Sequence, residues 1–101
     1  MCLITSVIFA SAQAQTFETV DDALNAYARG DYETAFPIFS THAQLGDVAA
    51  QNYLALMHAE GHGTEKDTAS ALKWYKRAAD QNSVDAQYAL GELAQKGDGV
   101  E

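Results

Sequence analysis

The sequence has little basic charge, and this scarcity excludes one broad class of partner. Of its 101 residues, six are Lys or Arg and 14 are Asp or Glu, which gives a net charge of -8. The densest basic cluster is short and interrupted by aromatic residues: Lys73, Lys76 and Arg77 around Trp74 and Tyr75. A nucleic-acid binder needs clustered Lys and Arg to displace counterions from phosphates. We therefore expect no nucleic-acid partner and interpret the cluster as a solvated helix face.

Proline and cysteine are each present once, at Pro37 and Cys2, and there are seven glycines. Proline removes a helical hydrogen bond, whereas alanine, which is abundant here, is the best helix former. Few breakers and many alanines favour an all-α fold. Cys2 lies just ahead of the apolar run of a leader-like segment and would be removed with that segment. A processed chain would then carry no thiol for a disulfide, a metal or a nucleophile.

No apolar run approaches the roughly 20 residues that a membrane-spanning helix needs. Residues 1–14, MCLITSVIFASAQA, contain a short apolar run followed by small residues in two A-x-A patterns, which is typical of a secretory signal peptide. The usual Lys or Arg before the run is missing, so the signal is atypical or the true start lies upstream. We predict cleavage after Ala12 or Ala14, export to the periplasm or the exterior, and no membrane span in the mature domain, residues 15–101.

The sequence also lacks the motifs of common catalytic sites, such as G-x-S-x-G or G-x-x-x-x-G-K. The segment His58, Glu60 and His62 could suggest a metal site, but it reads H-A-E-G-H rather than H-E-x-x-H. Gly61 and Gly63 should end the helix before His62 can align with His58. We therefore favour a non-enzymatic chain with no catalytic residue, metal or cofactor over a metal site or a small hydrolase.

An internal repeat of 36 residues is the strongest positive feature of the sequence. When residues 31–65 are placed against residues 67–101, ten of the 35 pairs are identical, well above chance. The first members of these pairs are Asp31, Ala35, Ala43, Val48, Ala50, Gln51, Leu54, Gly61, Gly63 and Glu65.

Apolar residues within each unit recur at helical spacing. We expect helices at residues 18–29, 32–45, 48–60, 68–81 and 84–96. Alanines alternate with larger residues along the predicted core faces, which lets helices approach closely. Tyr75 falls on such a face, whereas Trp74 lies beside it and should be partly exposed. Pro37 predicts either a kink or a later start of the second helix.

Helix-ending and helix-starting residues agree with this division. The predicted helices are followed by Gly30, by Gly61 with Gly63, and by Gly97 with Gly99. Three aspartates stand where a side-chain oxygen could cap the next helix: Asp31, Asp47 and Asp67.

The stretch ALKWYKRAADQNSVDAQYALGELAQKGDGV, residues 71–100, resembles the Sel-one-like repeat (SLR), a relative of the tetratricopeptide repeat. Residues that match the family pattern are Ala71, Trp74, Tyr75, Ala78, Ala79, Ala86, Gln87, Leu90, Gly91, Gly97, Gly99 and Val100. The resemblance extends upstream to about Val20. The chain departs from the pattern at Asn82, where a turn glycine is usual, and at His58 and Ala94, where a tyrosine is usual.

The resemblance implies an all-α, right-handed α-solenoid of antiparallel helix pairs, here about two and a half repeats. It also implies a scaffold or adaptor that binds another protein or peptide, in signalling or in the bacterial envelope. We expect a monomer without cofactors. The alternative is an N-terminal fragment of a longer repeat protein, because the sequence stops in a turn where another helix should begin.

The first helix of each pair lines the concave side in tetratricopeptide-like proteins, so its positions outside the core predict where a partner docks. These six residues, which we call the docking track, are Asp21, Asn25, Asn52, Leu56, Tyr88 and Glu92. Leu56 and Tyr88 favour a binding site, since interface anchors are commonly aromatic or apolar. A plain solvated face is the alternative.

Overall fold

The computed structural model describes residues 18–97, which form five helices and no strand. The helices are α2 (Val20–Ala28), α3 (Tyr32–Gln44), α4 (Val48–Glu60), α5 (Thr68–Asp80) and α6 (Val84–Lys96). Each predicted helix is confirmed to within two residues at either end. The predicted signal peptide, Cys2 and Gly99 lie outside the described residues.

A short polar side chain caps the start of every one of these helices. The three predicted caps are confirmed: Asp31, Asp47 and Asp67 accept hydrogen bonds at 3.3, 2.8 and 3.1 Å from the backbone N–H three residues further on. Thr19 and Ser83 cap α2 and α6 in the same way. These bonds satisfy N–H groups that have no partner within the helix, so the sequence fixes where each helix begins.

Glycines end two of the helices, as predicted. Gly61 and Gly97 follow α4 and α6 with φ of 76° and 74°, in the left-handed region where a side chain is disfavoured. Gly63 has an additional requirement, because a Cβ there would lie 2.7 Å from the carbonyl oxygen of Tyr32. The loop between α4 and α5 therefore packs against the start of α3.

Pro37 lies inside α3, which begins at Tyr32, so of the two predicted alternatives the later helix start is wrong, and a kink stays a prediction. The first turn forms ahead of the proline because Asp31 caps it and because Ala35 in that turn is completely buried. Cap and burial together offset the single backbone hydrogen bond that Pro37 cannot donate.

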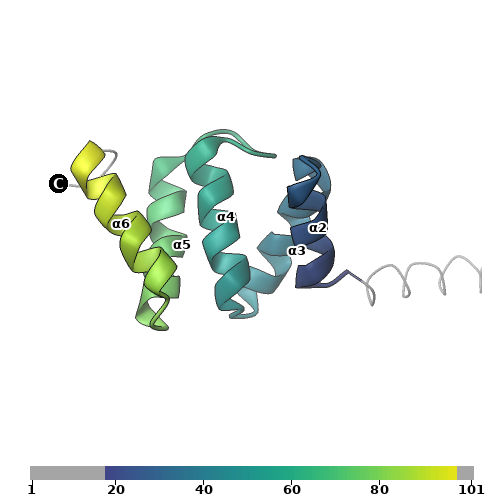
Figure 1. Ribbon diagram of the computed structural model, residues 1–101, viewed down its shortest axis with the longest axis horizontal. Helices are drawn as coiled ribbons and strands as arrows, with labels where there is room; N and C mark the ends of the chain where they lie inside the picture. Colours follow the sequence, from purple (N-terminus) through teal and green to yellow (C-terminus); the bar gives the residue numbers. More distant parts are fainter. Residues whose placement is uncertain (1–17, 98–101) are drawn as a thin grey trace, which may run out of the picture.

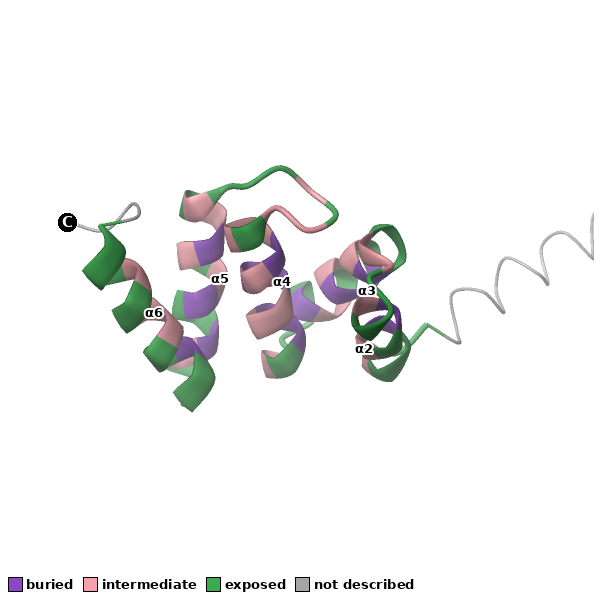
Figure 2. Ribbon diagram, turned by 45° about the horizontal axis from the view of Figure 1, so that its top comes forward, coloured by how far each residue is buried: buried purple, intermediate pink, exposed green. Residues whose placement is uncertain are grey.

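The helices stand side by side in a row, with the turns α3–α4 and α5–α6 at one end and the α4–α5 loop at the other (Figure 1). Each helix packs mainly against its neighbours in the sequence. The buried residues lie along the facing sides of the helices (Figure 2). This nearest-neighbour packing is that of a helical repeat array, in which no unit buries its apolar face alone.

Two hydrophobic clusters form the core, and α4 contributes to both. The first joins α2, α3 and α4 and contains the largest fully buried side chains, Phe39, Leu54 and Met57. The second joins α4, α5 and α6 and consists of Tyr75 among alanines: Ala55, Ala71, Ala78 and Ala86. Trp74 is half-buried beside both clusters, so the predicted placement of Trp74 and Tyr75 is confirmed.

One buried polar side chain links successive turns. Gln51 is 3% exposed, and its Nε2 donates to the carbonyl oxygen of Ala43 at 3.1 Å. Its Oε1 accepts from Nε2 of Gln81 at 2.8 Å. Gln51 thus ties the end of α3 to the end of α5 across α4, and its buried amide is satisfied on both sides.

Candidate docking surface

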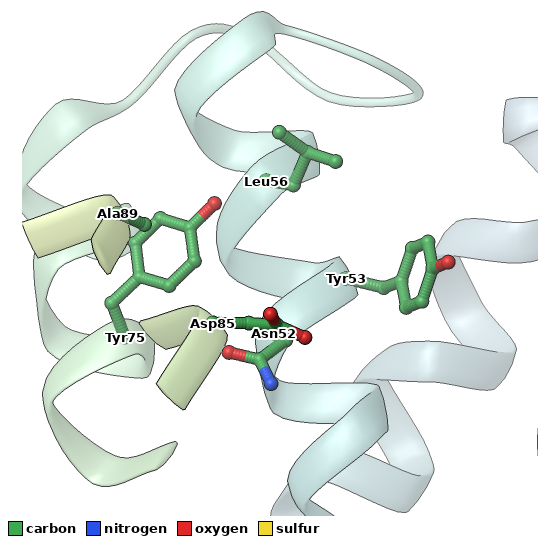
Figure 3. Close-up of a pocket in the computed structure, with 6 residues that line it drawn as sticks. All are labelled: Asn52, Tyr53, Leu56, Tyr75, Asp85 and Ala89. Carbon is green, nitrogen blue, oxygen red and sulfur yellow. The ribbon is translucent and has the colours of Figure 1, made fainter. Parts of the chain in front are cut away.

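Two residues of the docking track, Asn52 and Leu56, line a cavity of about 200 Å³ between α4, α5 and α6. The other lining residues are Tyr53, Tyr75, Asp85 and Ala89. We call this space the Tyr75 cavity. Figure 3 shows Leu56 near one end, Asn52 and Asp85 near the other, and the Tyr75 ring beside Ala89. Most of the lining is apolar, and its polar groups lie on α4, α5 and α6.

The Asn52 amide is only half satisfied. Its Nδ2 donates to the hydroxyl of Ser83 at 2.9 Å, which fixes the side chain against the start of α6. Its Oδ1 is buried and has no hydrogen-bond partner in the described part of the chain. A buried acceptor without a donor costs free energy, so the wall of the cavity at Asn52 is less well satisfied than the rest of the core.

Tyr75 and Asp85 supply the other polar groups of the cavity. Burial of Tyr75, which is 7% exposed, raises the pKa of its hydroxyl to about 12, with smaller contributions from Glu60 and other groups. The hydroxyl therefore stays neutral at physiological pH. Asp85 lies exposed in the first turn of α6, and neither Lys nor Arg lines the cavity. The cavity thus combines an aromatic ring, a carboxylate and an unsatisfied acceptor.

The repeat explains why this space is open. The 36-residue offset relates Phe39 to Tyr75 and Tyr53 to Ala89. In the first cluster the Tyr53 ring stacks on Phe39, with centroids 5.0 Å apart and planes 4° apart. In the second cluster Ala89 stands at the corresponding position and leaves one face of Tyr75 without such a ring. The cavity follows from the exchange of a tyrosine for an alanine.

Tyr88 and Glu92 line a separate hollow of about 300 Å³ on α6, together with Gln87, Gly91 and Gln95. Tyr88 is 68% exposed. An exposed tyrosine on the last described helix suits recognition, because its ring offers contact area and its hydroxyl a hydrogen bond.

Asp21 and Asn25 are exposed on α2 and line neither of these two spaces. Beside α2 the space equivalent to the Tyr75 cavity is filled by the ring of Tyr53. This ring packs between those of Phe39 and Tyr27, with centroids 5.0 and 5.3 Å away. The structure therefore brings four residues of the docking track into two cavities on α4 and α6. Whether all six act together stays a prediction.

Sequence reasoning did not assign Tyr53, Tyr75, Asp85 or Ala89 to the site. Three of them follow core spacing, which indicates burial and not a cavity. The repeat could have indicated the cavity, because Tyr53 and Ala89 occupy equivalent positions and alanine has the much smaller side chain.

His58 and His62 serve packing in different surroundings. His62 lies beyond the end of α4, stacked on Tyr32 with centroids 4.2 Å apart, and its Nδ1 is 3.3 Å from the hydroxyl of Tyr27. His58 meets the Phe36 ring edge-on at 5.5 Å. Burial lowers the pKa of His58, and Asp67 opposes this shift. Within residues 18–97, no three His, Cys, Asp or Glu side chains are grouped so that they could hold a metal ion.

The row of helices and its nearest-neighbour core define a tandem helical repeat protein. A profile of the Sel1 repeat matches residues 48–83 and 84–101, so the matches begin one 36-residue period apart and cover more than half of the chain. The chain belongs to the Sel1 repeat family. Membership implies a scaffold for protein–protein interaction, and proteins of this family are typically non-enzymatic.

Two relatives are longer than this chain and are matched over part of their length. A Sel1 repeat protein from Oxalobacter formigenes, known from its crystal structure, shares 32% sequence identity with this chain. The two structures superpose with a TM-score of 0.75, and the match covers 81% of this chain and 33% of that one. An F-box protein of Arabidopsis thaliana is 28% identical over 87 residues, which are 86% of this chain and 24% of the relative. The chain thus spans a quarter to a third of the length of these relatives. Among the described helices, none has the length and apolar character needed to cross a bilayer.

Proposed function

We propose that this chain is a non-enzymatic scaffold that binds a protein or peptide along α4 and α6. The observation that carries the proposal is the Tyr75 cavity, which opens beside Leu56 and has the half-satisfied Asn52 amide in its wall. Pockets that recognise a ligand combine apolar walls with a few converging polar groups. Tyr88, exposed on α6, supplies a second anchor of the kind that dominates interfaces.

The test is capture of partners with the processed chain and with a double variant, Leu56→Ser with Tyr88→Ala. The variant should keep its helical circular dichroism and lose the partners. Leu45→Ser is the matched control, because Leu45 is 78% exposed on the turn after α3, away from both cavities. Equal capture by the parent and the folded double variant would reject the docking surface.

The proposed location is the bacterial envelope or the exterior of the cell. The apolar run and the A-x-A patterns of residues 1–14 support export. Intact-mass measurement of the protein recovered from the envelope or medium tests this, and it should show a chain that begins after Ala12 or Ala14. An exported product that keeps residues 1–10 would contradict the signal peptide.

A second candidate is that the chain is the N-terminal part of a longer repeat protein whose function lies in further repeats or domains. The shares of 24% and 33% of the two relatives favour this candidate. Sequencing the gene beyond the codon for Glu101, together with the mass of the native protein, distinguishes the two. A stop codon at that point would remove the second candidate.

A further inference from the structure

We infer that the Tyr75 cavity accepts an arginine side chain of the partner, with the guanidinium stacked on Tyr75 and hydrogen-bonded to Asp85. The inference rests on the proposed scaffold function and names the chemistry that this part of the surface recognises. Three features of the cavity lead to it: its size and shape, its accessible hydrogen-bond acceptor and its charge.

The size of the cavity fits one side chain. Sites for whole small molecules usually enclose about 300–1,000 Å³, whereas this space is about 200 Å³. The first cluster shows which shape fits, because the Tyr53 ring stacks on Phe39 at the equivalent place. A planar group that enters from a partner would stack on Tyr75 in the same way.

Hydrogen bonding narrows the choice among planar side chains. A phenylalanine brings no hydrogen-bond donor for the exposed carboxylate of Asp85. A carboxylate or a carbonyl would bring a further acceptor. Arginine is planar, stacks on aromatic rings and carries five N–H donors in a fixed geometry, so one group can contact the ring of Tyr75 and donate to the carboxylate of Asp85.

The negative charge of the cavity also favours arginine. Asp85 is the single charged residue among those that line the cavity, and it is exposed, so a cation can reach it without burial of a bare charge. The chain as a whole carries a net charge of -8, which attracts basic segments. A guanidinium beside Asp85 would form charge-assisted hydrogen bonds, which are stronger than neutral ones.

Three blocked tripeptides test the inference, each with alanine on both sides of arginine, citrulline or norleucine. Citrulline is planar and donates N–H bonds but carries no charge, and norleucine offers only an apolar stem. Titration of the isotope-labelled full chain by NMR should move the amide signals around Asn52, Leu56 and Ala89. We expect arginine to bind at least about fivefold more tightly than citrulline, and norleucine most weakly.

Two variants locate the contact. Ala89→Tyr places the residue of the first unit in the cavity, so it should abolish the arginine-induced shifts while circular dichroism stays helical. Asp85→Asn should weaken the binding of arginine about fivefold and that of citrulline by less. Glu33→Gln is the matched control, because it removes an exposed acid from the first turn of α3 as Asp85→Asn does in α6. It should leave arginine binding unchanged.

Equal affinity for arginine and citrulline, strongest binding of norleucine, or full arginine binding by folded Ala89→Tyr would each overturn the inference. Equal weakening by Asp85→Asn and Glu33→Gln would overturn it too, since it would indicate a general charge effect. Loss of partners by the Leu56 and Tyr88 double variant without arginine binding would reject this inference alone. Specific arginine binding with unchanged partner capture would reject the proposed docking surface and support the arginine site.

Discussion

The two hydrophobic clusters are built from one repeat and yet differ in what fills them. Around Phe39, aromatic rings from α2 and α4 close the space, with Tyr27 edge-on and Tyr53 stacked. Around Tyr75, alanines from α4, α5 and α6 form the surroundings and a cavity remains. Close packing stabilises the first cluster, whereas the second lacks part of that packing and leaves a cavity.

The largest expected effect separates the two clusters directly. Phe39→Ala removes a completely buried ring and should lower the free energy of unfolding by about 3–5 kcal/mol. Tyr75→Ala should cost less, because one side of that ring already borders a cavity. Urea unfolding followed by circular dichroism measures both. Equal losses would show that the two clusters contribute alike and would break the comparison.

The next prediction is that the helices of the second cluster lie too close together for a side chain larger than alanine. Ala86 is completely buried between α5 and α6, so Ala86→Leu should overpack the contact and cost about 1–3 kcal/mol. Ala79 is half-buried, and Ala79→Leu should cost less. Ala94→Leu, at an exposed position of α6, is the control and should stay within about 0.5 kcal/mol of the parent. If all three variants unfold at the parent's urea midpoint, the helix faces are misassigned.

Filling the Tyr75 cavity should stabilise the chain, whereas the substitutions above destabilise it. Ala89→Tyr adds a ring against Tyr75 where Tyr53 already meets Phe39, so it should raise stability by about 0.5–1.5 kcal/mol. The midpoint of thermal unfolding checks this. A lower midpoint for Ala89→Tyr would mean that the second cluster cannot take the packing of the first.

The smallest expected effect is a pH dependence confined to the first cluster. Burial lowers the pKa of His58 below its ordinary value of 6.5, so the unfolded chain binds the proton more readily. The stabilisation is present above that value and declines as the pH falls below it. The equivalent position in α6 is Ala94, which does not titrate. His58→Tyr should flatten the dependence of the free energy of unfolding on pH between pH 7 and 5. An unchanged slope in the variant would show that another group causes the dependence.

The sequence predicted the helices well because their determinants are local. Asp31, Asp47 and Asp67 cap the helices that follow them, and Gly61 ends α4, each within a few residues of the element it bounds. The cavity was not predicted, because Tyr75 and Ala89 both carry the spacing of a core face. Whether two core residues meet or leave a space depends on side-chain volume across helices. That information appears only when the two units are compared position by position.

Gln51 works as a spacer between successive turns of the array. Its amide holds the carbonyl of Ala43 on one side and the side chain of Gln81 on the other, at 3.1 and 2.8 Å, so the length of one side chain sets how far apart α3 and α5 end. In a stack of repeats, a small change in this separation alters the curvature of the whole array. A shorter residue such as Asn at this position should therefore change the angle at which α6 presents Tyr88, although Gln51 itself lines neither of the two hollows.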